Sequence, residues 1–204
     1  ADSKLADHFG EIVGIDRSIG ALRQGLRELG VERNTLVWYC SDNGGLNLDP
    51  DAVGHLRGHK GDLYEGGIRV PGIIEWPGRI EPQVTDFPAP TMDILPTIVD
   101  LLDLPEESML AVHDGESIAA LFDGQTPQRT HAIPFRFQKN AALIDGDYKL
   151  LGTNQRRGSE WQLFDLKTDP GETKDLSAEL PERFARMKSE AEAMLQSVEA
   201  SEAG

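Results

Sequence analysis

Apolar residues at the start of the chain recur with the spacing of an amphipathic helix. Steps of three and four residues separate one series, which would form a single stripe along a helix: Ile12, Ile15, Ile19, Leu22, Leu26 and Leu29. Gly30 follows directly, where many helices end because glycine adopts the left-handed conformation at low cost. The pattern predicts a helix over residues 5–29.

Two short apolar runs are typical of strands. Residues 36–40 read Leu-Val-Trp-Tyr-Cys without interruption, which favours a strand buried on both faces, as in a parallel sheet. Residues 70–76 predict a second strand, with Pro71 at its start. A helix, a short turn and a buried strand form half of a βαβ unit, so we expect an α/β fold here.

The segments after each strand differ in character. Residues 41–67 are polar and rich in glycine, and such a long loop in a compact domain is usually functional or disordered. Residues 91–104 have the apolar spacing of a helix. Thr91 is the candidate N-cap of this helix, and Pro96 must lie in the first turn or cause a kink.

From about residue 110 the sequence predicts short strands followed by a helix. Asp145-Gly146-Asp147 is typical of a hairpin turn, and Pro181 marks the start of a last amphipathic helix. Three apolar segments before that helix predict short strands: residues 131–138, 141–151 and 161–166. We therefore expect a small antiparallel α+β subdomain over residues 110–204, after an α/β portion over residues 1–109.

Composition and charge narrow the class of protein. The 204 residues include 20 Lys and Arg against 35 Asp and Glu, a net charge of −15. This charge excludes a nucleic-acid binder and disfavours binding to an anionic membrane, because both depend on basic residues. Cys40 is the only cysteine, so an intrachain disulfide is impossible. Ala1-Asp2-Ser3-Lys4 is neither an initiator methionine nor a signal peptide, so we expect a processed chain or a piece of a longer one.

The candidate chemistry lies in the long loop. Ser41-Asp42-Asn43-Gly44 directly follows the first strand, and a carboxylate beside an amide carbonyl suits calcium or magnesium. The alternative is a plain turn, which the same residues favour. Lys60 lies among glycines and could bind an oxyanion, or it could be an ordinary solvated lysine. Glu65 and Arg69 could pair and brace the loop.

Two other features carry less weight. His55 and His59 have the spacing of a zinc pair on a helix, but Gly54 and Gly58 make a helix there improbable. Residues 125–129 have the Pro and Arg spacing of a Cys/Ser-x-Pro-x-Arg motif, but Gln stands in the nucleophile's place. We interpret residues 125–129 as a surface loop.

Taken together, these segments resemble the sulfatase family within the alkaline phosphatase superfamily. The resemblance covers nearly the whole chain, and the ordered set outweighs the plain-turn reading of Asp42 and Asn43. Its segments are Asn34-Thr35-Leu36-Val37 before Ser41-Asp42-Asn43-Gly44, Lys60-Gly61 with Tyr64-Glu65-Gly66-Gly67-Ile68-Arg69-Val70-Pro71, Trp76-Pro77-Gly78, Asp93-Ile94-Leu95-Pro96-Thr97, Asp114-Gly115-Glu116-Ser117, and Leu163-Phe164-Asp165-Leu166 with Asp169-Pro170 and Glu172.

The resemblance implies a fold and three site residues. The fold is the C-terminal portion of a mostly parallel mixed sheet flanked by helices, followed by the small antiparallel subdomain. Asp42 and Asn43 match the Asp-Asn pair that completes the family's calcium site. Lys60 matches the lysine that contacts the sulfate, so it is implied to bind substrate and to act as a catalytic residue during S–O cleavage. The family's nucleophile is a formylglycine made from the Cys or Ser of a Cys/Ser-x-Pro-x-Arg motif.

The sequence departs from the family at two points. It contains neither that motif nor the family's upstream Asp-Asp calcium ligands, and Cys40 has no following Pro or Arg. The resemblance therefore implies the C-terminal half of a sulfatase, inactive alone, whose partner is the missing N-terminal half. Without that half, we expect exposed apolar faces and self-association.

Two other functions stay open from the sequence. One is a phosphonate or phosphate monoester hydrolase of the same superfamily, and the other is a non-catalytic domain that binds sulfated glycans. For a sulfatase, the expected substrate is an aryl or carbohydrate sulfate ester. The family is commonly exported, so the resemblance implies a periplasmic or secreted protein.

Overall fold

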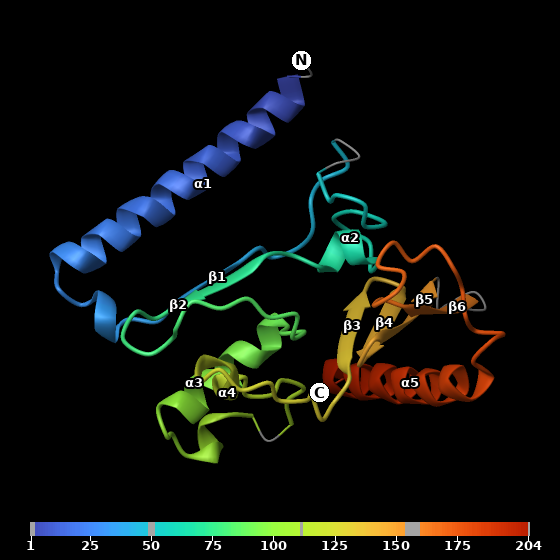
Figure 1. Cartoon of the computed structure of the whole chain (residues 1–204). Coiled ribbons are helices and arrows are strands. Elements are labelled where there is room, and N and C mark those ends of the chain that lie inside the picture. The colour runs from blue at the N-terminus through green and yellow to red at the C-terminus, as the bar shows by residue number, and fades with distance from the viewer. Residues whose placement is uncertain (1–2, 49–51, 111, 154–159, 204) are drawn as a thin grey trace.

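The computed structural model describes residues 3–48, 52–110, 112–153 and 160–203 (Figure 1). It contains two sheets, one of two strands and one of four, with helices around them. Within the described residues, no helix combines the length and the apolar character that a membrane crossing needs.

The first helix confirms the sequence pattern. Helix α1 covers Ser3–Glu28. It ends as predicted, because Gly30 has a φ of +69° and the Val31 amide donates to the Leu26 carbonyl at 3.0 Å. The apolar stripe is largely uncovered, with Ile12, Ile15 and Leu22 each 47% exposed. Figure 1 shows α1 extending away from the rest of the chain.

The two predicted strands pair with each other. Strand β1 (Val37–Cys40) and strand β2 (Gly72–Glu75) are antiparallel, with Val37 opposite Glu75 and Cys40 opposite Gly72. This antiparallel pair is the part of the expected mixed sheet that the described residues contain. The prediction that the first strand is buried on both faces is wrong, because β1 is only half-buried throughout. In β2, Ile73 is 61% exposed.

The helix expected over residues 91–104 begins later and ends earlier. A single 3₁₀ turn, Thr91–Asp93, leads into α3 (Ile94–Leu101). Pro96 lies in the first turn of α3, where its missing N–H breaks no helical bond. Thr91 is not the N-cap residue, because Pro90 holds that position for the 3₁₀ turn and Asp93 holds it for α3, and neither makes a side-chain cap bond. Instead, the Thr97 hydroxyl donates to the Asp93 carbonyl at 2.6 Å.

Four further short elements complete the chain order of helices and strands among the described residues. They are the 3₁₀ turns Glu32–Asn34 and Glu106–Ser108 and the helices α2 (Glu65–Ile68) and α4 (Ala119–Phe122). Leu121 and Phe122 of α4 and the preceding Ile118 form a buried cluster. Trp38 of β1 and Ile74 of β2 pack against it. This cluster covers one face of the two-stranded sheet.

The second sheet is an antiparallel meander of four strands in chain order. The segment predicted as one strand over residues 141–151 splits in two at Gly146, which has a φ of +58°, as the first central residue of a type II′ turn requires. The four strands are β3 (Ile133–Phe137), β4 (Asn140–Asp145), β5 (Tyr148–Thr153) and β6 (Glu160–Asp165).

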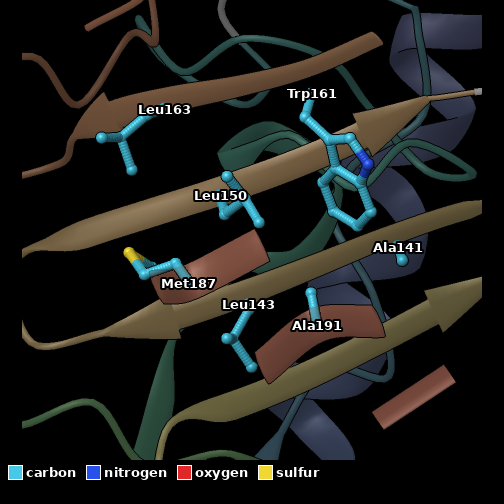
Figure 2. Packing of buried hydrophobic residues seen from close by; sticks show 7 residues of the cluster. All are labelled: Ala141, Leu143, Leu150, Trp161, Leu163, Met187 and Ala191. Atoms are coloured by element: carbon cyan, nitrogen blue, oxygen red, sulfur yellow. The ribbon is translucent and has the colours of Figure 1, made fainter. Parts of the chain in front are cut away.

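Both faces of this sheet are covered. Helix α5 (Pro181–Ala203) packs on one face, where Met187 and Ala191 meet Leu143, Leu150 and Leu163 (Figure 2). On the other face, Leu63, Tyr64 and Ile68 pack against Ala142, Leu151 and Phe164. The loop that carries Lys60 and the helix α2 that follows it therefore rest on the C-terminal sheet.

Candidate active site

Asp42 and Asn43 follow the carboxyl end of β1 in a tight turn. The Ser41 hydroxyl donates to the Asn43 carbonyl at 2.9 Å, and the Asn43 amide nitrogen donates to Asp42 Oδ2 at 2.5 Å. Asp42 is exposed and Asn43 is half-buried. The two candidate metal ligands therefore have adjacent side-chain polar groups at the end of a strand.

The side-chain oxygens of Asp42 and Asn43 suit a hard divalent cation. Both side chains offer oxygen, which calcium prefers. In the structure the Asn43 NH₂ group faces the Asp42 carboxylate. A half-turn of the amide about its last torsion would present its oxygen beside that carboxylate instead. Within the described residues, no group of three or more His, Cys, Asp and Glu could hold a metal ion. These two residues would therefore supply only part of a cation's coordination shell.

Glycines bring a second segment against this turn. The Gly44 amide donates to the Gly67 carbonyl at 2.8 Å. A Cβ on Gly44 would lie 1.8 Å from the Gly66 oxygen, and a Cβ on Gly66 would lie 2.3 Å from the Gly58 oxygen. Any other residue at these positions would separate the backbones. Gly44 and Gly66 thus allow these segments of the long loop to pack backbone against backbone.

Lys60 belongs to the same group of loops. Its backbone amide donates to the Gly45 carbonyl at 2.8 Å, which ties it to the turn that carries Asp42 and Asn43. The Lys60 side chain is exposed, and its ammonium makes no ion pair with any described residue. The structure therefore brings all three candidate residues together on adjoining loops, with a cation available for an anionic ligand.

A buried ion cluster lies between this loop and the C-terminal sheet. The ammonium of Lys149, in β5, is 3.1 Å from Glu65 Oε1 and 2.9 Å from Glu172 Oε1. Glu172 and Lys149 are fully buried, and Glu65 is 4% exposed. Burial raises the pKa of Glu172 from its usual value, while the Lys149 charge acts against that rise.

The ion cluster bears on the predicted brace between Glu65 and Arg69. The expected brace between Glu65 and Arg69 exists, but at 3.8 Å, and Lys149 is the closer partner. The sequence carries one signal of this role. Lys149 has the same position in the strand alternation as Leu151, so it lies on the face of β5 that meets α2 and Phe164. A lysine buried on such an apolar face needs a carboxylate partner.

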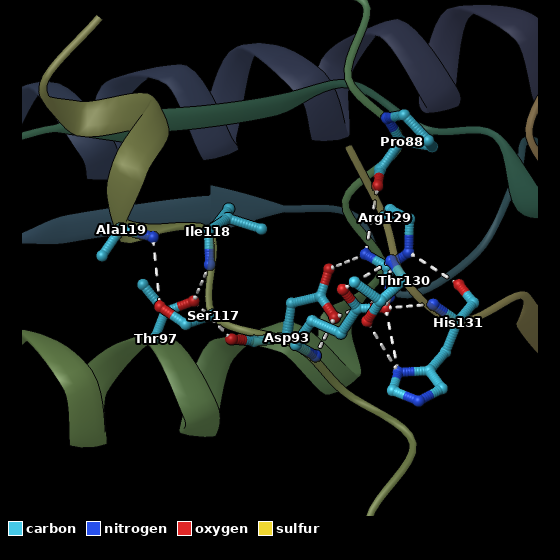
Figure 3. Close-up of polar contacts among 10 residues, drawn as sticks. Pro88, Asp93, Thr97, Ser117, Ile118, Ala119, Arg129, Thr130 and His131 are labelled. Carbon is cyan, nitrogen blue, oxygen red and sulfur yellow. Dashed lines mark hydrogen bonds and ion pairs between the residues drawn. The ribbon is translucent and has the colours of Figure 1, made fainter. Parts of the chain in front are cut away.

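A second ion-paired cluster corrects the interpretation of residues 125–129 at one position, because the glutamines and the threonine there are exposed as expected but Arg129 is not. Arg129 is not a surface residue, since its side chain is only 9% exposed and it donates to both carboxylate oxygens of buried Asp93 at 2.5 and 3.2 Å (Figure 3). Glu116 accepts the amides of Thr130 and His131. Although burial acts to raise the pKa of Glu116, these amides and the Arg129 charge together lower it.

Comparison with known proteins identifies the family. A family model described as Sulfatase matches residues 1–104, and one described as N-sulphoglucosamine sulphohydrolase, C-terminal, matches residues 58–200. The chain belongs to the sulfatase family. The resemblance that the sequence suggested is thereby confirmed, as is the expected fold of a C-terminal sulfatase portion.

Several relatives show how much of such a protein the chain spans. It is 34% identical to steryl-sulfatase of Rattus norvegicus over 67% of this chain, and 31% identical to arylsulfatase A of Bos taurus over 82% of it. The solved structure of Ps i-CgsB with k-i-k-neocarrahexaose superposes with a TM-score of 0.73 at 29% identity over 90% of this chain. The chain spans only 25%, 38% and 41% of these three relatives.

One further solved structure has the same fold but another activity. The phosphonate monoester hydrolase of Agrobacterium radiobacter superposes with a TM-score of 0.65 at 24% identity, over 92% of this chain and 40% of that protein. The fold alone therefore does not separate sulfate from phosphonate chemistry.

Proposed function

We propose that this chain is the C-terminal part of a sulfatase that hydrolyses sulfate esters. Asp42 and Asn43 would be ligands of its calcium ion, and Lys60 would bind the sulfate group as a catalytic residue. The observation that carries the proposal is the hydrogen bond from the Lys60 amide to the Gly45 carbonyl, because it joins the candidate anion-binding residue to the candidate metal-binding turn.

Each residue has a distinct task in this proposal. The Asp42 carboxylate and the Asn43 amide oxygen would hold calcium, which supplies positive charge to the reacting group when bound. The Lys60 ammonium would pair with a sulfate oxygen and stabilise the negative charge that grows on it during S–O cleavage. Because the protein has a net charge of −15, such local cations are needed to attract an anionic substrate.

The nucleophile lies outside this sequence in our proposal. It would be a formylglycine made from a Cys/Ser-x-Pro-x-Arg motif in an N-terminal portion, which would also carry the remaining calcium ligands. Reading the gene upstream of the codon for Ala1 tests this directly. An in-frame Cys/Ser-x-Pro-x-Arg is the expected result, whereas an initiator Met codon just before Ala1 would contradict it.

The substrate class follows from the relatives. Arylsulfatase A and steryl-sulfatase point to sulfate esters, and the neocarrahexaose complex shows a relative that binds an oligosaccharide. We therefore propose an aryl or carbohydrate sulfate ester as the substrate. By analogy with the family we also propose export to the periplasm or the exterior.

The second candidate is a phosphonate or phosphate monoester hydrolase, which the fold shared with the Agrobacterium enzyme favours. The full-length protein should be assayed with matched aryl sulfate, aryl phosphate and phenylphosphonate esters. A kcat/KM highest for the sulfate supports our proposal, and a higher value for either phosphorus ester favours the second candidate. Binding of sulfated glycans without turnover of any ester would support a non-catalytic domain instead.

Two substitutions test the site residues in the same assay. We expect Asp42→Asn and Lys60→Ala each to lower kcat/KM for an aryl sulfate by at least ~100-fold, because the first weakens the hold on calcium and the second removes a cation that stabilises the transition state. Lys167→Ala is the control, since this exposed lysine pairs with Asp147 at 3.5 Å on the C-terminal sheet, away from the candidate residues. Unchanged turnover in Asp42→Asn and Lys60→Ala would remove both residues from the active site.

A further inference from the structure

Lys149 joins three segments that are distant in the sequence. It projects from β5 toward the loop face of the C-terminal sheet and meets Glu65 of α2 at 3.1 Å and Glu172 at 2.9 Å. Its side chain has no exposed surface. Burying charged groups this completely is unfavourable unless opposite charges lie beside them, and here the ammonium and the two carboxylates are one another's neighbours.

Glu172 holds both ends of the segment that contains Lys60. Glu172 Oε2 accepts the Glu65 amide at 2.6 Å, and the Glu172 backbone carbonyl accepts Arg57 Nη1 at 2.8 Å. The Arg57 carbonyl in turn accepts the Gly66 amide at 2.7 Å, which closes the segment into a loop. Lys60 lies between these anchors, and its own side chain takes no part in them.

The Arg57 anchor is further fixed by an aromatic ring. The guanidinium carbon lies 4.0 Å from the centre of the Tyr64 ring. Tyr64 packs in turn against Phe164 of β6, with ring centres 6.4 Å apart. The loop is therefore attached to the C-terminal sheet by apolar packing as well as by ions, and among the described residues only Lys149 pairs with both buried carboxylates.

We propose that Lys149 is a positioning residue of the active site. Through Glu65 and Glu172 it fixes residues 57–65 on the C-terminal sheet, and so it sets where Lys60 stands relative to Asp42 and Asn43. Lys149 itself is buried beneath the loop and touches no substrate. The inference rests on the proposed function in one respect, the role of Lys60, whereas the anchoring of the loop can be tested without any activity.

The first experiment measures amide hydrogen exchange in the 204-residue chain. Lys149→Met keeps an unbranched side chain that is one atom shorter, but it leaves two carboxylates facing each other. We expect exchange in residues 57–67 to accelerate by at least ~10-fold, with little change in the amides that pair β3 with β4. Lys167→Met removes an exposed lysine–carboxylate pair from the same subdomain and should change neither region.

A second variant guards against a failure to fold. Glu172→Gln keeps an oxygen that can accept the Glu65 amide and removes only one charge, so its effect on residues 57–67 should have the same location and a smaller size. Unchanged exchange in residues 57–67, or an equal rise throughout the chain, would overturn the anchoring role. Loss of the whole fold in Glu172→Gln would also contradict it.

The second experiment separates positioning from general stability. In the full-length enzyme, we expect Lys149→Met to lower kcat/KM by ~10- to 100-fold, and Lys149→Met with Lys60→Ala to be within ~3-fold of Lys60→Ala alone. Multiplicative losses would mean that Lys149 acts independently of Lys60 and would overturn the proposal. If Lys60→Ala leaves turnover unchanged, the proposed function fails at that residue, while hydrogen exchange still decides the anchoring.

Discussion

Gly44 stands where any side chain would collide with a neighbouring backbone. We expect Gly44→Ala to lower the free energy of unfolding by about 3 kcal/mol, because its Cβ would lie 1.8 Å from the Gly66 oxygen and the two loops would have to separate. Chemical denaturation followed by tryptophan fluorescence measures this. Gly72→Ala is the matched control, since a Cβ there meets nothing within 4 Å. Equal stability of the two variants would contradict the close packing.

Residue-level chemistry was predictable where it depends on neighbours in the sequence. The Asp42-Asn43 turn and the glycine hairpin at Gly146 follow from local preferences. Arg129 and Lys149 could not be placed this way, because a charged side chain is buried only when partners from elsewhere in the chain surround it. For Arg129 the partner is Asp93, and for Lys149 the partners are Glu65 and Glu172.

At the scale of elements, periodicity indicated which segments become helices and strands but not what they pack against. The stripe of α1 has the spacing of a buried face, yet Ile12 and Ile15 are each 47% exposed. The bidentate pair between Arg23 and Glu75, at 2.7 and 2.8 Å, attaches this helix to β2. Periodicity therefore indicated the helix and its apolar stripe, but the described residues leave most of that stripe exposed.

The uncovered stripe leads to a prediction about association. We expect the chain to self-associate at micromolar concentration, because exposed apolar surface of this kind is removed from water when copies meet. Ile12→Lys with Ile15→Lys should shift sedimentation velocity profiles toward the monomer. Glu28→Lys adds the same charge on the opposite side of α1, so it is the control and should leave association unchanged. A wild-type chain that stays monomeric at a concentration 100 times higher than the micromolar one would contradict the prediction.

The boundary expected between residues 1–109 and residues 110–204 stays a prediction, and the contacts show why it is hard to draw. The sheet of β3–β6 is covered on one face by its own helix α5 and on the other by Leu63, Tyr64 and Ile68 from the α/β portion. The ion cluster around Lys149 lies on the same face. A cut at residue 109 would therefore leave the loop of Lys60 without the surface on which it rests.

At the scale of the whole molecule, the two proposed calcium ligands would be too few for a strong site. Calcium takes six to eight oxygen ligands, and Asp42 and Asn43 would supply side-chain oxygens for only part of that shell. The chain also spans only 25% to 38% of the steryl-sulfatase and arylsulfatase A relatives named above. We therefore predict that the chain alone binds calcium with a dissociation constant weaker than ~1 mM and hydrolyses no aryl sulfate.

Titration calorimetry with CaCl₂ and a chromogenic aryl sulfate test this prediction together. Asp42→Asn in the chain serves as the reference for calcium held elsewhere on a protein with a net charge of −15. A submillimolar site that Asp42→Asn abolishes would show that this chain completes the metal site by itself. In that case the missing ligands would have to come from backbone carbonyls or water around the Asp42 turn, and the N-terminal portion would be needed only for the nucleophile.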